Sequence, residues 1–257
     1  MISRRAATGI GAVLCLLLAL VVARFPDNPL TRQAQGYAAG VATTAAGTYV
    51  TLRTLNAVLS TAQEIEVGMS LIASGSAQPL KVLEPIDDTI ERIASLVFGI
   101  MVSTGVIAIA LGPMSAIGFG LLALALAVAA LRDRPLTGMS RRFMWYGIFL
   151  GLALPLALTL SAPLAGFLTE AAYETHSATV AEITARVGGA QMIEDGGSDM
   201  GLREFRQMAL NVWNRADDLI GALVAIFGIY VFRIFLLPVL MIVGLFLAAR
   251  SLARSPT

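Results

Sequence analysis

The sequence has few of the side chains on which enzyme and metal chemistry usually depends. Cys15 is the only cysteine among 257 residues, and His176 is the only histidine. A lone cysteine provides neither a disulfide framework nor a thiolate cluster, and a lone histidine excludes most zinc, haem and Ser-His-Asp chemistry. The chain also lacks a Walker loop, a GxSxG elbow, an HExxH helix and a dinucleotide fingerprint. We therefore expect no cofactor, no metal and no enzymatic activity.

Charge is also scarce. Charged residues make up 14% of the chain, against about 25% in soluble domains, and hydrophobic residues make up 57%, with a mean hydropathy of +0.78. A soluble domain of this length cannot bury so much apolar surface, so the composition predicts an all-α, multi-pass membrane protein in contact with membrane lipid. The net charge of +1 gives no reason to expect a nucleic-acid partner.

Four apolar regions are long enough for a transmembrane helix, which needs about 20 mostly apolar residues. They are Ala6–Ala23, Ile93–Leu131, Phe143–Leu168 and Leu219–Ala249. Because two arginines precede the first region, residues 1–23 fit either a cleaved signal peptide or a retained anchor. Prolines predict kinks in the third and fourth regions, at Pro155, Pro163 and Pro238.

The second region, 93–131, is long enough to cross a membrane twice. Three interpretations remain open. The region is one long kinked helix that lies partly in the interface, or it is a re-entrant hairpin broken at Gly112 and Pro113. In the third interpretation, the segment from Gly36 is an extra span, which gives six crossings in all.

Basic residues predict the orientation, because cytoplasmic loops carry an excess of Arg and Lys. They gather before the first region, between the second and third, and after the fourth, and Asp133 is the only acidic residue among them. The basic residues are Arg4, Arg5, Arg132, Arg134, Arg141, Arg142, Arg250 and Arg254. Four spans with both termini in the cytoplasm satisfy this pattern.

The two halves of the chain share a pattern that indicates a tandem repeat. SRR precedes an apolar region at Ser3 and again at Ser140, an Asp pair opens the second and fourth regions, and a proline interrupts each of these. We predict two helical-hairpin repeats, residues 1–135 and 136–257, each with a span, an outer amphipathic segment and a kinked span. The first span then has an internal counterpart, which favours its retention as an anchor.

The Asp pairs are the first candidate site residues: Asp87 and Asp88 in one half, Asp217 and Asp218 in the other. Carboxylates at a helix N-terminus accept hydrogen bonds from unpaired N–H groups and complement the helix dipole, which is the structural interpretation of both pairs. The functional interpretation is an outward-facing cation site formed by all four carboxylates.

Arg233 is the remaining candidate, because it is the one basic residue well inside an apolar run, where a central arginine costs about 3 kcal/mol. It snorkels to the outer surface if the membrane core runs from Tyr230 to Ala249; otherwise it forms an ion pair or lines a polar pathway. His176 lies in an acidic segment, where we expect a solvated face in place of a metal site. The neighbouring acids are Glu170, Glu174 and Glu182.

Both outer segments contain an amphipathic helix, with apolar residues at steps of three and four. Such helices lie on the membrane surface, pack against each other, or form a docking surface for an outer partner. Small residues from Ser115 onward indicate close helix packing, within the chain or in a homo-oligomer. The apolar positions are Leu52, Leu55, Leu59, Ala62 and Ile65, then Leu202, Phe205, Ala209 and Val212.

The stretches LRTLNAVLSTAQEIEV (52–67) and LEPIDDTIERIAS (83–95) are similar to a group of uncharacterised bacterial membrane proteins. The resemblance covers the first outer segment only. It implies a location in the bacterial inner membrane and implies no activity, cofactor or site residue.

The leading functional prediction is a non-enzymatic membrane scaffold or accessory subunit, whose outer amphipathic helices bind a second copy or a membrane-protein partner. The alternative is a small oligomeric channel or transporter with Arg233 and the Asp pairs on its path, although the spans hold few other polar residues. A third class, an enzyme acting on lipid through the outer Glu/His group, predicts loss of activity in His176→Ala.

Overall fold

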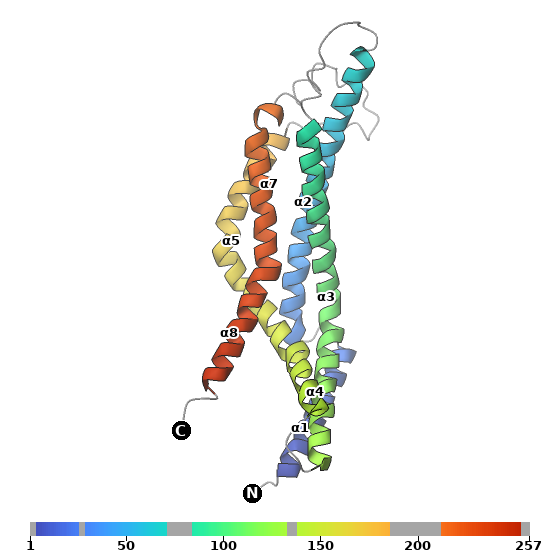
Figure 1. Ribbon diagram of the computed structural model, residues 1–257, viewed down its shortest axis with the longest axis vertical. Helices are drawn as coiled ribbons and strands as arrows, with labels where there is room; N and C mark the ends of the chain where they lie inside the picture. Colours follow the sequence, from blue (N-terminus) through green and yellow to red (C-terminus); the bar gives the residue numbers. More distant parts are fainter. Residues whose placement is uncertain (1–3, 26–28, 71–83, 133–137, 186–211, 253–257) are drawn as a thin grey trace. The chain divides into compact units, whose positions relative to one another are not determined.

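The computed structural model describes residues 4–25, 29–70, 84–132, 138–185 and 212–252 (Figure 1). Every element in these ranges is helical, which confirms the predicted all-α class. Two short elements, η2 and η4, are π-helices, and the others are α-helices. In chain order they are α1 (Arg4–Arg24), α2 (Pro29–Ser70), α3 (Glu84–Arg132), α4 (Met139–Ile148), η2 (Phe149–Ala153), α5 (Leu154–Thr184), α7 (Ala216–Val231), η4 (Phe232–Leu236) and α8 (Leu237–Leu252).

Four helical stretches are long and apolar enough to cross a membrane, as the sequence predicts. The second of them lies in α3, a helix of 49 residues that continues without a break through Gly112 and Pro113. The re-entrant hairpin is therefore wrong, and so is the six-span interpretation with its two crossings in 93–131, because one proline removes only a single N–H group from a strongly helical apolar run and the helix does not turn back. The segment from Gly36 belongs to α2, a 42-residue helix that is not among the four.

The chain forms two compact units, each assembled from segments that are far apart in the sequence. Unit 1 comprises Met1–Ala42, Ser103–Phe167 and Phe232–Thr257, and unit 2 comprises Thr43–Val102 and Leu168–Val231. Each unit therefore draws on both halves of the chain. The tandem repeat of residues 1–135 and 136–257 stays a prediction.

The two units differ in charge and in exposed surface. By sequence, unit 1 has 11 basic and 2 acidic residues, a net charge of +9, whereas unit 2 has 7 basic and 15 acidic residues, a net charge of −8. Of the 37 large apolar side chains that are exposed in the described ranges, 30 belong to unit 1. Unit 1 thus presents an apolar surface and a basic sequence, and unit 2 is the acidic part of the protein.

The buried residues of α2 follow a heptad pattern, with alternating steps of four and three. In unit 1 they are small, at Ala34, Ala38 and Val41, as in membrane helices that approach closely. In unit 2 the same seam continues with leucines, each of which stabilises a core by about 1.5–3 kcal/mol when fully buried. The leucines are Leu52, Leu55 and Leu59, all at most 1% exposed.

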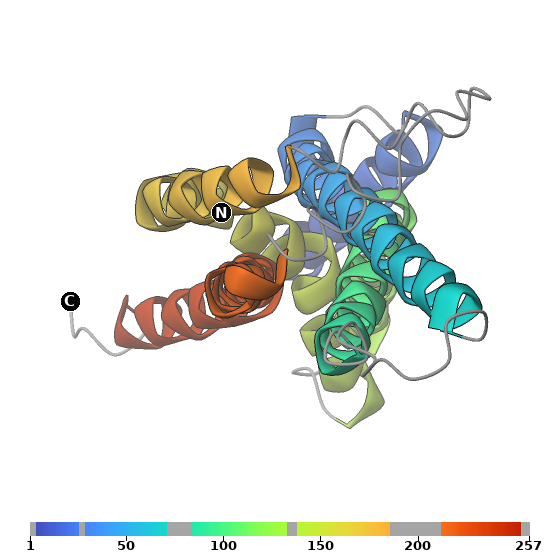
Figure 2. The ribbon, with the colours of Figure 1, turned by 90° about the horizontal axis from the view of Figure 1, so that it is seen from above.

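The core of unit 2 covers the apolar face of the first outer helix. Here α2 and α3 lie side by side in both views (Figures 1 and 2), and the rings of Tyr49 and Phe98 meet at 5.3 Å. The α3 residues Ile86, Ile90 and Ile93 are buried at helical spacing. Of the second predicted amphipathic helix, residues 202–211 lie outside the described residues.

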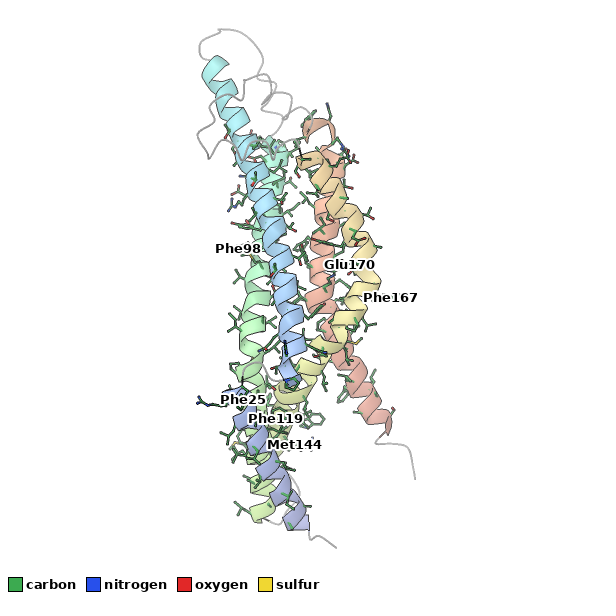
Figure 3. The ribbon with its side chains drawn as sticks, turned by 180° about the vertical axis from the view of Figure 1, so that it is seen from behind. Phe25, Phe98, Phe119, Met144, Phe167 and Glu170 are labelled. Atoms are coloured by element: carbon green, nitrogen blue, oxygen red, sulfur yellow. The ribbon has the colours of Figure 1, made fainter. Side chains whose placement is uncertain are left out.

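Unit 1 has two buried apolar clusters. One joins Val22 of α1 to Phe119 and Leu122 of α3, and Met144 of α4 packs against it (Figure 3). The other joins α2, α3, α5 and η4. Its buried members are Ala34, Leu111, Leu158 and Ile234.

Candidate functional site

All four aspartates lie in unit 2, near the starts of helices. Asp87 is in the first turn of α3, and Asp217 and Asp218 are in the first turn of α7. Asp88 follows Asp87 and is exposed, as are the two aspartates of α7. These positions are the ones at which a carboxylate complements the positive end of the helix dipole.

Asp87 is tied to a neighbouring helix. The hydroxyl of Ser60 on α2 donates a hydrogen bond to Asp87 Oδ2 at 3.2 Å. The second carboxylate oxygen, Oδ1, is buried and accepts no hydrogen bond from the described residues. The same holds for Oδ1 of Asn56, one helical turn before Ser60. A buried acceptor without a donor costs free energy, so packing alone does not explain these two polar side chains.

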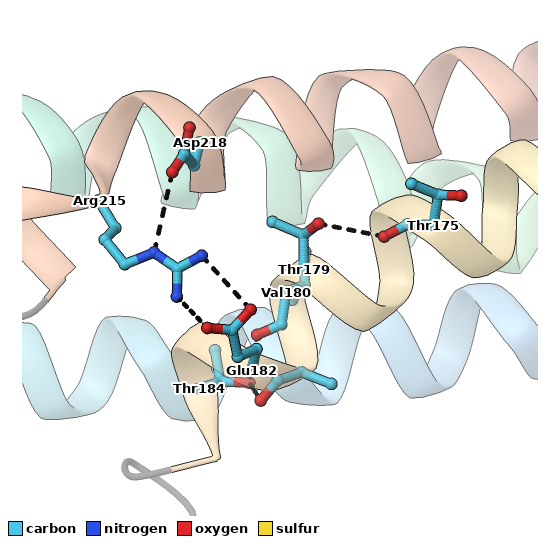
Figure 4. Close-up of polar contacts among 8 residues, drawn as sticks. Thr175, Thr179, Val180, Glu182, Thr184, Arg215 and Asp218 are labelled. Carbon is cyan, nitrogen blue, oxygen red and sulfur yellow. Dashed lines mark hydrogen bonds and ion pairs between the residues drawn. The ribbon is translucent and has the colours of Figure 1, made fainter.

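Asp218 belongs to an ionic cluster that joins the end of α5 to the start of α7 (Figure 4). Arg215 Nη1 donates to Glu182 Oε1 at 2.6 Å and Nη2 donates to Oε2 at 3.5 Å, while Nε lies 3.8 Å from Asp218 Oδ2. The hydrogen bond to Glu182 raises the pKa of Arg215, which keeps the guanidinium charged. Arg215 and Glu182 thus form a bidentate ion pair that links two helices. Asp218 has a structural role in this cluster, as the second carboxylate beside Arg215.

The two Asp pairs do not converge on a common ion site. Within the described ranges, no group of three or more His, Cys, Asp or Glu side chains is arranged to hold a metal ion. His176 is half-buried on α5, and its neighbour Glu174 is exposed, as is Glu170 (Figure 3). The acidic residues of this part of the chain therefore form a charged surface.

Unit 2 also contains a buried hydroxyl cluster that the sequence analysis missed. Tyr230 of α7 is fully buried, and its hydroxyl lies 2.7 Å from Thr48 Oγ1 on α2 and 3.5 Å from the hydroxyl of Tyr173 on α5. Because a buried tyrosine hydroxyl needs a partner, this cluster joins three helices. Its sequence signal was a tyrosine inside an apolar run and a threonine on the α2 seam.

Arg233 lies in η4, within unit 1, and is half-buried. Both π-helices end two residues before a proline: η2 before Pro155 and η4 before Pro238. Proline has no N–H and clashes with the carbonyl four residues earlier, and a π turn is one way in which a helix accommodates it. By contrast, Pro113 and Pro163 lie inside α-helices without a change of helix type.

In each π-helix, one backbone carbonyl loses its N–H partner because the residue that would supply it is proline. A hydroxyl from another helix donates a hydrogen bond to that carbonyl instead. The carbonyl of Gly151 would pair with residue 155 in an α-helix, and Ser115 Oγ donates to it at 3.2 Å. The carbonyl of Arg233 would pair with residue 238 in a π turn, and the Tyr37 hydroxyl donates to it at 2.7 Å.

The first π-helix packs backbone to backbone against α3. A Cβ atom on Gly118 would lie 2.6 Å from Gly151 Cα, and one on Gly147 would lie 2.8 Å from the carbonyl oxygen of Gly118. These positions accept only glycine, and the GxxxG spacing of 147 and 151 is typical of tightly packed membrane helices. The predicted close packing from Ser115 onward is therefore found within the chain.

Comparison with protein-family models, with curated proteins and with solved structures found no match for this chain. The charges and contacts of the chain's own residues are therefore what indicates its function.

Proposed function

We propose that this chain is a non-enzymatic, integral scaffold or accessory subunit of a bacterial inner membrane. In this proposal the segments of unit 1 cross the lipid and those of unit 2 carry the outer surface. The observation that carries the proposal is the opposite charge of the units, net +9 for unit 1 and net −8 for unit 2. Because cytoplasmic loops are rich in arginine, both termini are then cytoplasmic and the acidic unit is external.

The lengths of the helical segments support this division. Unit 1 contains four helical segments of at least 21 residues, and a transmembrane helix needs about 20. They are residues 4–24, 103–132, 139–167 and 232–252. Most of the exposed apolar side chains lie on them, where lipid would cover their surface.

The exposed surface of unit 2 has fewer large apolar side chains than that of unit 1, and it carries exposed acidic residues. The apolar seam of α2 is buried in the core of the unit, at Leu52, Leu55 and Leu59, so it is not the docking face. Asp88 and Glu91 on α3 are exposed, as are the acids on α5 and α7. Such a surface favours a partner with a basic outer surface, because complementary charge steers association and excludes other partners.

The first experiment is to extract the protein gently from its native membrane and to measure the mass and composition of the particle. We expect a second protein at fixed stoichiometry, and we expect Asp88→Asn with Glu91→Gln to reduce its amount. Asp133→Asn, in a basic patch, is the matched control and should retain the partner. A particle that contains this chain alone, and that moves ions or solutes across liposomes after purification, contradicts the proposal and favours a channel or transporter.

A further inference from the structure

Within unit 1, helix α8 packs most closely at its N-terminal end. Ile234 of η4 and Leu237 of α8 are buried, at 4% and 3% exposure, and Pro238 is buried as well. None of the residues from 239 to 251 is buried. Farther along, the ring of Phe246 meets that of Trp145 on α4, with 6.4 Å between centroids. The buried residues are therefore confined to the start of the helix, and beyond them Met241, Ile242 and Leu245 are half-buried.

The two π-helices are fixed by different kinds of contact. The glycine contacts between α3 and η2 leave no room for a methyl group at Gly118 or Gly147, so η2 packs backbone to backbone. η4 contains no glycine, and side chains contribute to fixing it. Ile234 is buried in the cluster formed with α2, α3 and α5, and the Tyr37 hydroxyl donates to the carbonyl of Arg233.

We propose that η4 is a hinge and that the Tyr37 hydroxyl is its latch. With the hydrogen bond to the Arg233 carbonyl made, α8 rests against α4; with the bond broken, α8 swings away from Trp145. π-bulges and prolines are the usual sites at which helices bend. A hydrogen bond between membrane helices has a small net value, so its loss shifts the ratio of closed to open forms by about threefold. This inference does not depend on the proposed function.

The test uses quenching of a bimane label by Trp145, which requires contact between the two. The background is Cys15→Ser with Trp213→Phe, which leaves Trp145 as the only tryptophan. The label is attached at Val243→Cys, one turn from Phe246 on the same side of α8 and exposed. We expect Tyr37→Phe, which removes only the hydroxyl, to reduce quenching as the closed-to-open ratio falls by about threefold.

Three controls interpret the result. Trp145→Phe gives the unquenched reference, and Tyr49→Phe removes another α2 hydroxyl that does not contact η4 and should change nothing. Pro238→Ala restores the missing N–H group, so in that background Tyr37→Phe should have no effect. Unchanged quenching in a folded Tyr37→Phe protein, or an equal effect in the Pro238→Ala background, overturns the proposal. If Tyr37→Phe does not fold, Pro238→Ala alone decides: because the Arg233 carbonyl then has a backbone N–H partner within its own helix, quenching must differ from that of the parent protein, and equal quenching refutes the hinge.

Discussion

Tyr230 donates a hydrogen bond to Thr48, and the direction of that bond follows from a third residue. Thr48 Oγ1 lies 2.7 Å from the Tyr230 hydroxyl and 3.2 Å from the carbonyl oxygen of Thr44, to which it donates. A threonine hydroxyl has a single hydrogen, so Thr48 accepts from Tyr230. The hydroxyl of Tyr173 lies farther from the Tyr230 hydroxyl than Thr48 does, at 3.5 Å.

This asymmetry predicts unequal effects of two conservative substitutions. Thr48→Val removes the nearest acceptor of the buried Tyr230 hydroxyl, at 2.7 Å, and should lower the free energy of unfolding by about 1–3 kcal/mol. Tyr230→Phe should cost about 1 kcal/mol or less, because Thr48 keeps its bond to Thr44. The double variant should resemble Tyr230→Phe alone. Thermal unfolding in mild detergent measures all three, and a larger loss for Tyr230→Phe than for Thr48→Val would contradict this assignment.

The sequence was sufficient for features that depend on local pattern. Twenty or more apolar residues in a row identify a potential span, and so the four apolar helices were predictable. The position of Asp87 and Asp217 near helix starts was predictable for the same reason, since an acid before an apolar helical run is a local signal. The helical face of α2 at Leu52, Leu55 and Leu59 followed from its spacing.

The features that the sequence did not reveal depend on neighbours in space. Pro155 and Pro238 follow π-helices whereas Pro113 does not, and the difference cannot be read from the prolines themselves. It coincides with hydroxyl donors on other helices, Ser115 and Tyr37, which lie far away in the sequence. The two units were missed for a similar reason, because each combines segments from both halves of the chain.

The glycine contact between α3 and η2 gives a prediction with an internal control. Gly118→Ala places a methyl group against the backbone of Gly151, which cannot move aside as a side chain would. We expect a loss of about 1–3 kcal/mol or more in unfolding free energy, or failure to accumulate in the membrane. Gly120→Ala, two residues away with nothing within 4 Å, should be neutral or stabilise the helix by up to about 1 kcal/mol. Equal stability of the two variants would show that this backbone contact does not form.

The tie between Arg215 and Glu182 should respond to charge and salt. Glu182→Arg places two arginines together and should lower the thermal midpoint, and the exchange of both charges, Glu182→Arg with Arg215→Glu, should recover part of the loss. Because Glu182 is 69% exposed, the change should be small and should fade as salt is raised. Glu174→Arg, on an exposed position of the same helix, is the control for added positive charge alone. No recovery in the exchanged variant would mean that the two side chains do not pair in solution.

The orientation of the chain can be tested by cysteine labelling in intact spheroplasts, in a Cys15→Ser background. A maleimide that cannot cross the membrane should label Ser74→Cys and Gly197→Cys directly, because both substitutions lie in the predicted outer segments. Ser3→Cys and Thr137→Cys lie beside basic patches and should react only after permeabilisation.

The labels at residues 74 and 137 also test whether α2 is an extra span. With four spans, residue 74 is external and residue 137 is cytoplasmic. With α2 as a fifth span, residue 74 is cytoplasmic and, because α3 is one unbroken helix that crosses once, residue 137 is external. Labelling of Ser74→Cys only after permeabilisation, with direct labelling of Thr137→Cys, would therefore support five spans. It would also place the exposed carboxylates of Asp88 and Glu91 outside the reach of any periplasmic partner, and the proposed external role of unit 2 would fail with it.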